Sequence, residues 1–350
     1  MIASNALTRP TISIRHIAIV LVAAAMAYPI LLRLLFLVAG QATPPSATTA
    51  IEQGVILALL FVLPFAVPGL GLAALLAMRG REDADGYRIR RLALLVVAAP
   101  PLFTGTGVVT FLAGIGGWDH LVWWVMWAAS MPLWLCFRDR DRDRACAATP
   151  VPDWLRIGHG IAALLVLLGY VGLHLGNHLT AWWGADAHRV VQLTLRAWYR
   201  DPWIEVSLVA LLAWLVGSGV ALARIYSRRP EMDGYRVLQV AFGANLGAFL
   251  LSHLIAALWM ARGVLGIDPD WTWAAGGDAG LIGDPWNVRL IPHYFLAVLA
   301  VLAHVGLGAR VVALGHGAAR RTGHAIAVTF GVVGLLMALL LSAALMGARL

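Results

Sequence analysis

The sequence predicts an all-α, polytopic membrane protein. Hydrophobic residues make up 61% of its 350 residues and charged residues only 13%, and the mean hydropathy is +0.80. A soluble domain carries about a quarter charged residues. The apolar residues also gather in segments of about 20 to 28, each long enough to cross a hydrocarbon core of about 30 Å as a helix.

We expect about nine transmembrane helices, one for each long apolar run. The predicted spans are 15–39, 52–78, 91–114, 118–137, 155–182, 203–225, 237–262, 290–313 and 324–346. Arginines gather in the loops at 78–91, 138–144, 224–236 and 309–321. The positive-inside rule places these loops and the N-terminus in the cytoplasm, as expected for a multi-pass protein of a bacterial-type inner membrane. The net charge of +8 thus reflects membrane orientation and gives no reason to expect a nucleic acid partner.

One connection does not follow this charge pattern. The segment 184–203 carries three arginines although it falls on the outer side. We interpret it as an amphipathic helix that lies on the outer surface of the membrane.

The chain contains an internal repeat. Residues 69–90 align without gaps to residues 217–238, and both copies contain the tetrapeptide Asp-Gly-Tyr-Arg, at 85–88 and 233–236. Four predicted helices separate equivalent points, and this even number gives both copies the same orientation, as in a parallel repeat. We therefore predict a four-helix bundle in 1–145, a second in 146–316, and an additional helix in 317–350.

Histidines within the predicted spans are the main functional signal, because ionisable residues are costly in lipid. His174 and His253 lie at similar outer depths on different helices. Two imidazoles that face each other across a helical bundle can ligate the iron of a b-type haem. The alternative is that each histidine forms a hydrogen bond to a neighbouring helix, and the residues alone leave both readings open.

The block from 174 to 219 resembles the cytochrome b membrane-anchor subunit of succinate dehydrogenase and fumarate reductase, of the single-chain, two-haem type. The residues that match the motifs of that family are His174, Gly184, Glu205, Gly243, His253, His304 and Gly308. The resemblance covers about 155 to 315 and implies that His174 and His253 ligate an outer haem. It also implies that His304 is a ligand of an inner haem.

The sequence departs from this family at one ligand position. Val216 stands where the family has a histidine on its second core helix, so His304 lacks its usual partner. We expect one haem b, with the inner ligand set incomplete. His159 is an alternative partner for His304, and His178 could compete with His174 as the outer ligand. In the first half, the repeat places no ligand opposite His174 or His253, so that half is expected to bind no haem.

Other polar and aromatic residues are candidates for a quinone site. Quinone chemistry transfers protons as well as electrons, and Glu205 is a candidate proton donor or acceptor. Alternatively, its carboxylate only stabilises the N-terminus of its helix by interacting with the helix dipole. Trp183 lies either in a quinone pocket with Trp182 and Trp198 or in an interfacial aromatic belt.

Charged and polar residues near the outer pair are candidates for binding the haem propionates. Arg189 and Arg196 could pair with the propionates or remain solvated, and we expect His178 to lie near the same groups.

These observations predict a haem b membrane anchor that transfers electrons between a soluble dehydrogenase and the quinone pool. Its expected partners are flavoprotein and iron–sulfur subunits on the cytoplasmic side, and the chain would not be an enzyme alone. One alternative is a protein of the same fold without dehydrogenase partners, acting as a haem-binding sensor or scaffold. A weaker alternative is a small-molecule transporter. No nucleotide-binding, zinc-protease or Cys-x-x-Cys motif is present.

Overall fold

A computed structural model describes the backbone of residues 14–40, 47–136, 150–229 and 231–350, and side chains in these ranges except 40, 47–61 and 132–136. These ranges are helical with short connections, and no strand occurs in them. The predicted all-α fold is therefore confirmed. The expected boundary between the two bundles, at residue 145, lies outside the described residues.

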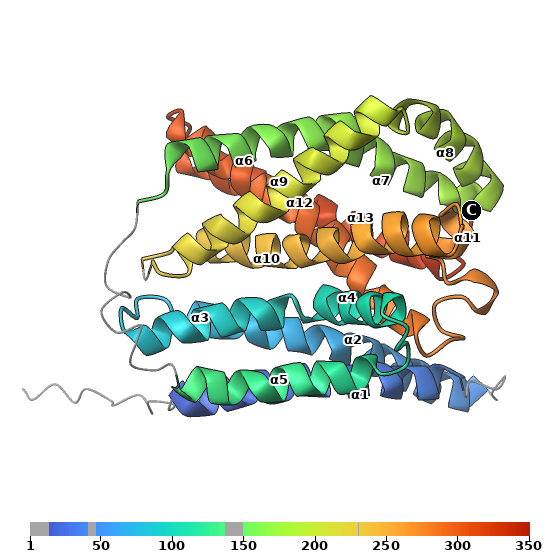
Figure 1. Cartoon of the computed structure of the whole chain (residues 1–350), viewed down its shortest axis with the longest axis horizontal. Helices are drawn as coiled ribbons and strands as arrows, with labels where there is room; N and C mark the ends of the chain where they lie inside the picture. The colour runs from blue at the N-terminus through green and yellow to red at the C-terminus, as the bar shows by residue number, and fades with distance from the viewer. Residues whose placement is uncertain (1–13, 41–46, 137–149, 230) are drawn as a thin grey trace, which may run out of the picture.

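The described part of the first half contains five helices, which lie in the lower part of Figure 1. They are α1 (Ile14–Gly40), α2 (Ala47–Ala77), α3 (Ala84–Val97), α4 (Ala99–Leu112) and α5 (Asp119–Cys136). Their shared core includes Tyr28, Val67, Phe103 and Trp123, each at most 1% exposed. The indole of Trp123 donates a hydrogen bond of 2.7 Å to the carbonyl of Ala25, which ties α5 to α1.

The second half forms the upper part of Figure 1. Its long helices are α6 (Asp153–Val166), α7 (Gly172–Leu179), α8 (Ala185–Tyr199), α9 (Pro202–Tyr226), α10 (Gly234–Leu254), α12 (Leu290–Gly315) and α13 (Arg320–Leu345). A π-helical turn, η1 (Leu167–Val171), joins α6 to α7, and another, η3 (Ile255–Val264), extends α10. The short helix α11 (Trp271–Ala274) packs near α8 at the right of Figure 1.

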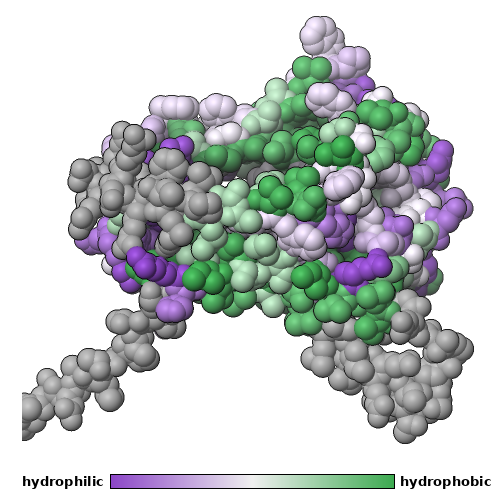
Figure 2. All heavy atoms as spheres, turned by 60° about the horizontal axis from the view of Figure 1, so that its bottom comes forward, coloured by the Kyte–Doolittle hydropathy of each residue, from purple (hydrophilic) through white to green (hydrophobic). Residues whose placement is uncertain are grey.

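Six of the described helices are long and apolar enough to cross a membrane. They are Ile14–Ala39, Asp153–Trp183, Pro202–Tyr226, Gly234–Val264, Asn287–Gly315 and Arg320–Leu345. Large apolar side chains such as Leu168, Val206 and Val220 are more than 60% exposed, as expected for a surface that contacts lipid. Figure 2 shows such apolar side chains over the middle of one face. The chain is thus a multi-pass membrane protein, whereas the total of nine spans stays a prediction.

The predicted straight span at 91–114 differs from the structure. Helices α3 and α4 meet at Ala98 with a bend of 64°, and together they form a broken span or a re-entrant loop. Pro100 and Pro101 follow the bend directly in the first turn of α4. Because proline has no backbone N–H to donate to the preceding turn and clashes with it, the pair favours a new helix start at this point.

The two halves meet along α10, which packs against α3 and α4 (Figure 1). The side-chain amide of Asn245 donates a hydrogen bond of 3.3 Å to the carbonyl of Val97, and these residues are 148 positions apart. This separation equals the offset between the two sequence copies (233 minus 85). The predicted repeat and its two-bundle arrangement stay predictions.

Candidate functional site

His174 on α7 and His253 on α10 face each other, as the sequence predicted from their similar depth. Their ring centroids are 6.4 Å apart and the ring planes are inclined by 66°. Each imidazole stacks on an aromatic ring one turn earlier in its own helix, with Tyr170 at 5.0 Å from His174 and Phe249 at 5.1 Å from His253. An iron about 2 Å from one nitrogen of each ring would separate the centroids by about 6 Å, so the spacing fits a bis-histidine haem.

His178 extends this pair toward the surface. Its Nε2 lies 3.1 Å from Nε2 of His174, and its Nδ1 lies 3.1 Å from Nε2 of His188 on α8. The side-chain amide of Asn177 also contacts His188, at 3.2 Å. Three imidazoles thus form a hydrogen-bonded chain, so His178 is a neighbour of the outer pair. Haem binding at Nε2 of His174 would break its contact with His178, whereas binding at Nδ1 would keep it.

Helix α8 is the amphipathic surface helix that the sequence predicted between two spans. Its polar residues His188, Gln192 and Arg196 are at most 9% exposed, whereas Val190 and Leu193 are at least 50% exposed. The helix therefore turns its polar face toward the protein and its apolar face outward. Burial lowers the pKa of His188 to about 4, although the Asp270 carboxylate acts in the opposite direction. His188 is consequently neutral at physiological pH.

The arginines proposed as propionate partners contact the acidic loop instead. Arg196 forms an ion pair with Asp268 and also donates to the carbonyl of Pro269. Arg189 lies 3.6 Å from Asp270. In this structure these arginines fasten α8 to the loop before α11.

Glu205 lies in an ion pair, and Trp183 lies at the protein surface. The carboxylate of Glu205 forms an ion pair with Arg262 at the end of η3. Trp183 is 67% exposed, which agrees with the aromatic-belt alternative.

A cavity of about 250 Å³ adjoins His253 between the two halves of the chain. Helix α4 contributes Thr104 and Val108, and α12 contributes His293 and Tyr294. His293 is 3% exposed, and its Nδ1 is buried without a hydrogen-bond partner. The cavity therefore combines apolar walls with an imidazole that can donate or accept a proton. Sequence reasoning placed His293 only at the outer mouth of its helix and gave it no role.

The structure also pairs His159 on α6 with His304 on α12. Their ring centroids are again 6.4 Å apart, and their planes are inclined by 81°. The sequence left this pairing open as an alternative, because Val216 occupies the expected partner position. Val216 lies on α9, whereas His159 approaches His304 from α6.

The number of ligands in each pair differs from that of a zinc site. The described residues contain no group of three or more histidine, cysteine, aspartate or glutamate side chains that could hold a metal ion. A structural or catalytic zinc site needs at least three protein ligands. A haem iron needs only two axial ligands, because the porphyrin supplies the other four nitrogens.

Comparison with known proteins found no relative. No family model, curated protein or solved structure matches this chain.

Proposed function

We propose that this chain is a haem b-containing membrane subunit that exchanges electrons between a soluble flavin and iron–sulfur dehydrogenase and the quinone pool. The observation that carries the proposal is the approach of His174 and His253 at 6.4 Å from two membrane helices. A bound haem would supply one-electron chemistry there. The imidazoles would hold the iron, and Tyr170 and Phe249 would keep the two rings in place by stacking.

The cavity beside His253 is the proposed quinone site. It adjoins one of the proposed ligands, and its apolar walls suit a quinone ring. The unpartnered Nδ1 of His293 is available to form a hydrogen bond to a quinone oxygen. We propose this cavity in place of the tryptophan pocket of the sequence hypothesis, because Trp183 is 67% exposed and Trp198 is 46% exposed.

The imidazole chain is a candidate for proton exchange beside the outer pair. His178 links His174 to His188 on α8, and the chain ends there at a buried Nδ1 that has no partner. Quinone reduction and oxidation require proton exchange, and neutral imidazoles in contact can pass a proton between them. Glu205 is a second candidate for this exchange, although its ion pair with Arg262 must open first.

Haem content tests this proposal directly. We expect the purified chain to bind haem and to show a reduced-minus-oxidised spectrum of a low-spin b-type cytochrome. His174→Ala and His253→Ala should each remove the outer haem, because the iron loses one axial ligand. His316→Ala is the control, since His316 lies at the exposed end of α12. A wild-type chain that folds without haem would refute the proposal.

The second candidate function is a scaffold or sensor that keeps the same fold but has no dehydrogenase partners. The observation that favours it is the contact between His174 and His178, which satisfies these imidazoles without a ligand. Co-purification separates the two candidates. An electron-transfer anchor should bring flavin and iron–sulfur subunits with it, and quinol should reduce its haem.

A further inference from the structure

We propose that an arginine-lined pocket in the second half binds a phosphate group, which the headgroup of an anionic phospholipid supplies. The pocket has a volume of about 450 Å³, within the range of small-molecule sites. None of the proposed histidine ligands lines it, so this binding does not depend on haem. The pocket is lined by four arginines and two acids, namely Arg156, Arg229, Arg236, Arg310, Glu231 and Asp233.

The pocket lies where four apolar helices end. Tyr226 is the last residue of α9, and Arg236 lies in the first turn of α10. Arg156 comes from the first turn of α6, and Arg310 from the last two turns of α12. All four helices belong to segments that are long and apolar enough to cross a membrane. The pocket is therefore at the depth of the lipid phosphates, on the side that the positive-inside rule assigns to the cytoplasm.

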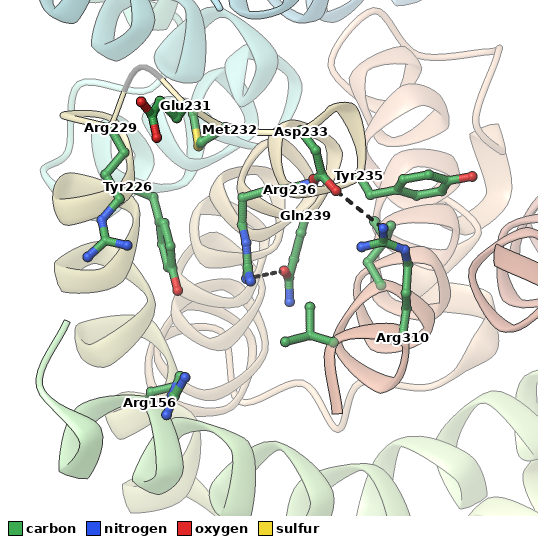
Figure 3. Close-up of a pocket in the computed structure, with 12 residues that line it drawn as sticks. Arg156, Tyr226, Arg229, Glu231, Met232, Asp233, Tyr235, Arg236, Gln239 and Arg310 are labelled. Carbon is green, nitrogen blue, oxygen red and sulfur yellow. Dashed lines mark hydrogen bonds and ion pairs between the residues drawn. The ribbon is translucent and has the colours of Figure 1, made fainter. Parts of the chain in front are cut away.

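Two tyrosine rings hold guanidinium groups of this pocket. The guanidinium carbon of Arg236 lies 4.8 Å from the ring centroid of Tyr226. That of Arg310 lies 4.2 Å from the ring centroid of Tyr235. Figure 3 shows Tyr226 and Arg236 directed into the same space, which Arg156 approaches from α6. Because stacking uses the face of a guanidinium, the N–H groups at its edge remain available to an anion.

The N–H donors of these arginines are incompletely used. Arg236 donates to the side-chain carbonyl of Gln239 at 2.6 Å, a neutral acceptor that does not compensate its positive charge. The Nε of Arg310 is buried and has no hydrogen-bond partner among the described residues, although its guanidinium pairs with Asp233 at 3.2 Å. Buried donors are normally satisfied by a protein group, a ligand or water. A phosphate oxygen would accept strong, charge-assisted hydrogen bonds from both arginines.

The charge of the pocket matches a single phosphodiester. Its four arginines exceed its two acids by two positive charges, and Asp153, which pairs with Arg156 at 2.8 Å, reduces the excess to one. The side chains of Asp153 and Asp233 are 78% and 55% exposed. Water screens such exposed carboxylates, so they neutralise the arginines only weakly. The pocket consequently attracts a headgroup with one negative charge.

Apolar side chains on the pocket wall favour a lipid over free phosphate. Met232, Leu307 and Val311 line the pocket together with the arginines. They can contact the glycerol and the upper acyl carbons of a phospholipid, whereas inorganic phosphate has no apolar part to place against them. Basic pockets between membrane helices on the cytoplasmic side are typical sites for anionic headgroups. A headgroup of the phosphatidylglycerol type, with one phosphodiester charge, has the chemistry that fits.

Lipid titration of the purified chain tests the site. The chain in lipid-free detergent is titrated with phosphatidylglycerol or with zwitterionic phosphatidylcholine, and the rise in unfolding temperature reports the affinity. We expect phosphatidylglycerol to stabilise the protein more strongly. Arg236→Gln should weaken the binding of phosphatidylglycerol about tenfold, because a charge-assisted hydrogen bond to the phosphate is lost.

Two further variants make this test specific. Arg320→Gln is the matched control and should bind like the wild type, because it removes the same charge from an exposed position at the start of α13. Gln239→Glu keeps the contact with Arg236 but compensates its charge, so it should also weaken binding. This variant replaces Arg236→Gln in the test if the unfolding temperature without lipid shows that Arg236→Gln does not fold.

The outcomes separate the sources of the phosphate. If inorganic phosphate displaces phosphatidylglycerol at comparable concentrations, the ligand is free phosphate and the lipid assignment is wrong. If both lipids stabilise the protein equally, or if Arg320→Gln weakens binding as much as Arg236→Gln, the pocket is not a phosphate site. None of these variants changes a proposed haem ligand, so haem content stays a separate test of the proposed function.

Discussion

The two halves of the chain use buried polar groups in opposite ways. Along the first half, the buried charged groups have partners, although the Tyr28 hydroxyl is buried without one. Asp119 and Arg289 are 2–3% exposed and form an ion pair of 2.5 Å, and Arg90 donates to the carbonyls of Ser227 and Met78 at 2.7 and 3.0 Å. In the second half, the Nδ1 atoms of His188 and His293 are buried and have no hydrogen-bond partner in the described residues. The buried ion pair of Asp119 with Arg289 joins the first half to the second and is expected to stabilise their interface.

The largest expected effect comes from breaking the Asp119–Arg289 pair. Asp119→Asn leaves the guanidinium of Arg289 buried without its counter-charge, and such a loss costs about 3–5 kcal/mol. We expect a strong decrease in the thermal unfolding temperature of the protein in detergent. The double variant Asp119→Asn/Arg289→Met should regain part of this loss, because it removes the unpaired charge.

Asp153→Asn is the matched control for this prediction. Asp153 and Arg156 form an ion pair whose side chains are 78% and 58% exposed, and exposed pairs contribute about 0–1 kcal/mol. An unchanged unfolding temperature in Asp119→Asn would show that the interface of the two halves does not depend on the buried pair.

A smaller loss is expected at Gly71, within the packing of the first half. An added Cβ would lie 2.8 Å from both the carbonyl oxygen of Ala93 and the amide nitrogen of Val97. Because backbone atoms cannot easily move away, Gly71→Ala should separate α2 from α3 at a cost of about 1–3 kcal/mol. Thermal unfolding measures this change, and the folded fraction should keep its haem content. Gly69→Ala on the same helix has open space and should not destabilise the protein.

Gly243→Ala is the corresponding change in the second half. Its Cβ would meet the imidazole of His304, a side chain that can rotate away, rather than the backbone. We therefore expect little change in the unfolding temperature, because the imidazole can move without displacing the backbone. Gly247→Ala, one turn further along α10, has no neighbour within 4 Å and should leave the unfolding temperature unchanged. A loss of stability as large as that of Gly71→Ala would contradict the contrast between the halves.

The sequence predicted the helices well, because each is a long apolar run, but it predicted contacts between them less completely. Equal depth was enough to pair His174 with His253, and it left His159 as an open alternative for His304. That pairing depends on helix rotation, which the π-helical turn at Leu167–Val171 alters between His159 and His174. The bend at Ala98 did have a local signal in Pro100 and Pro101. The ion pair of Arg196 with Asp268 joins segments 72 residues apart, so no local pattern could indicate it.

The smallest expected effect is a pH dependence that arises at His188. Burial lowers its pKa in the folded protein to about 4 from a usual value of 6.5, so between these values the unfolded chain binds a proton that the folded chain does not. Stability should therefore fall as the pH decreases from 6.5 toward 4, by about 1.4 kcal/mol per pH unit. The attraction of Asp270 opposes this shift, and the repulsion of Arg196 adds to it.

Thermal unfolding at pH 7.5 and 5.5 should show the decrease in stability in the wild type and a smaller decrease in His188→Gln. His316→Gln, at an exposed position, should behave like the wild type. An equal decrease in His188→Gln would place the titrating group elsewhere, and the contrast between paired and unpaired polar groups would then not extend to α8.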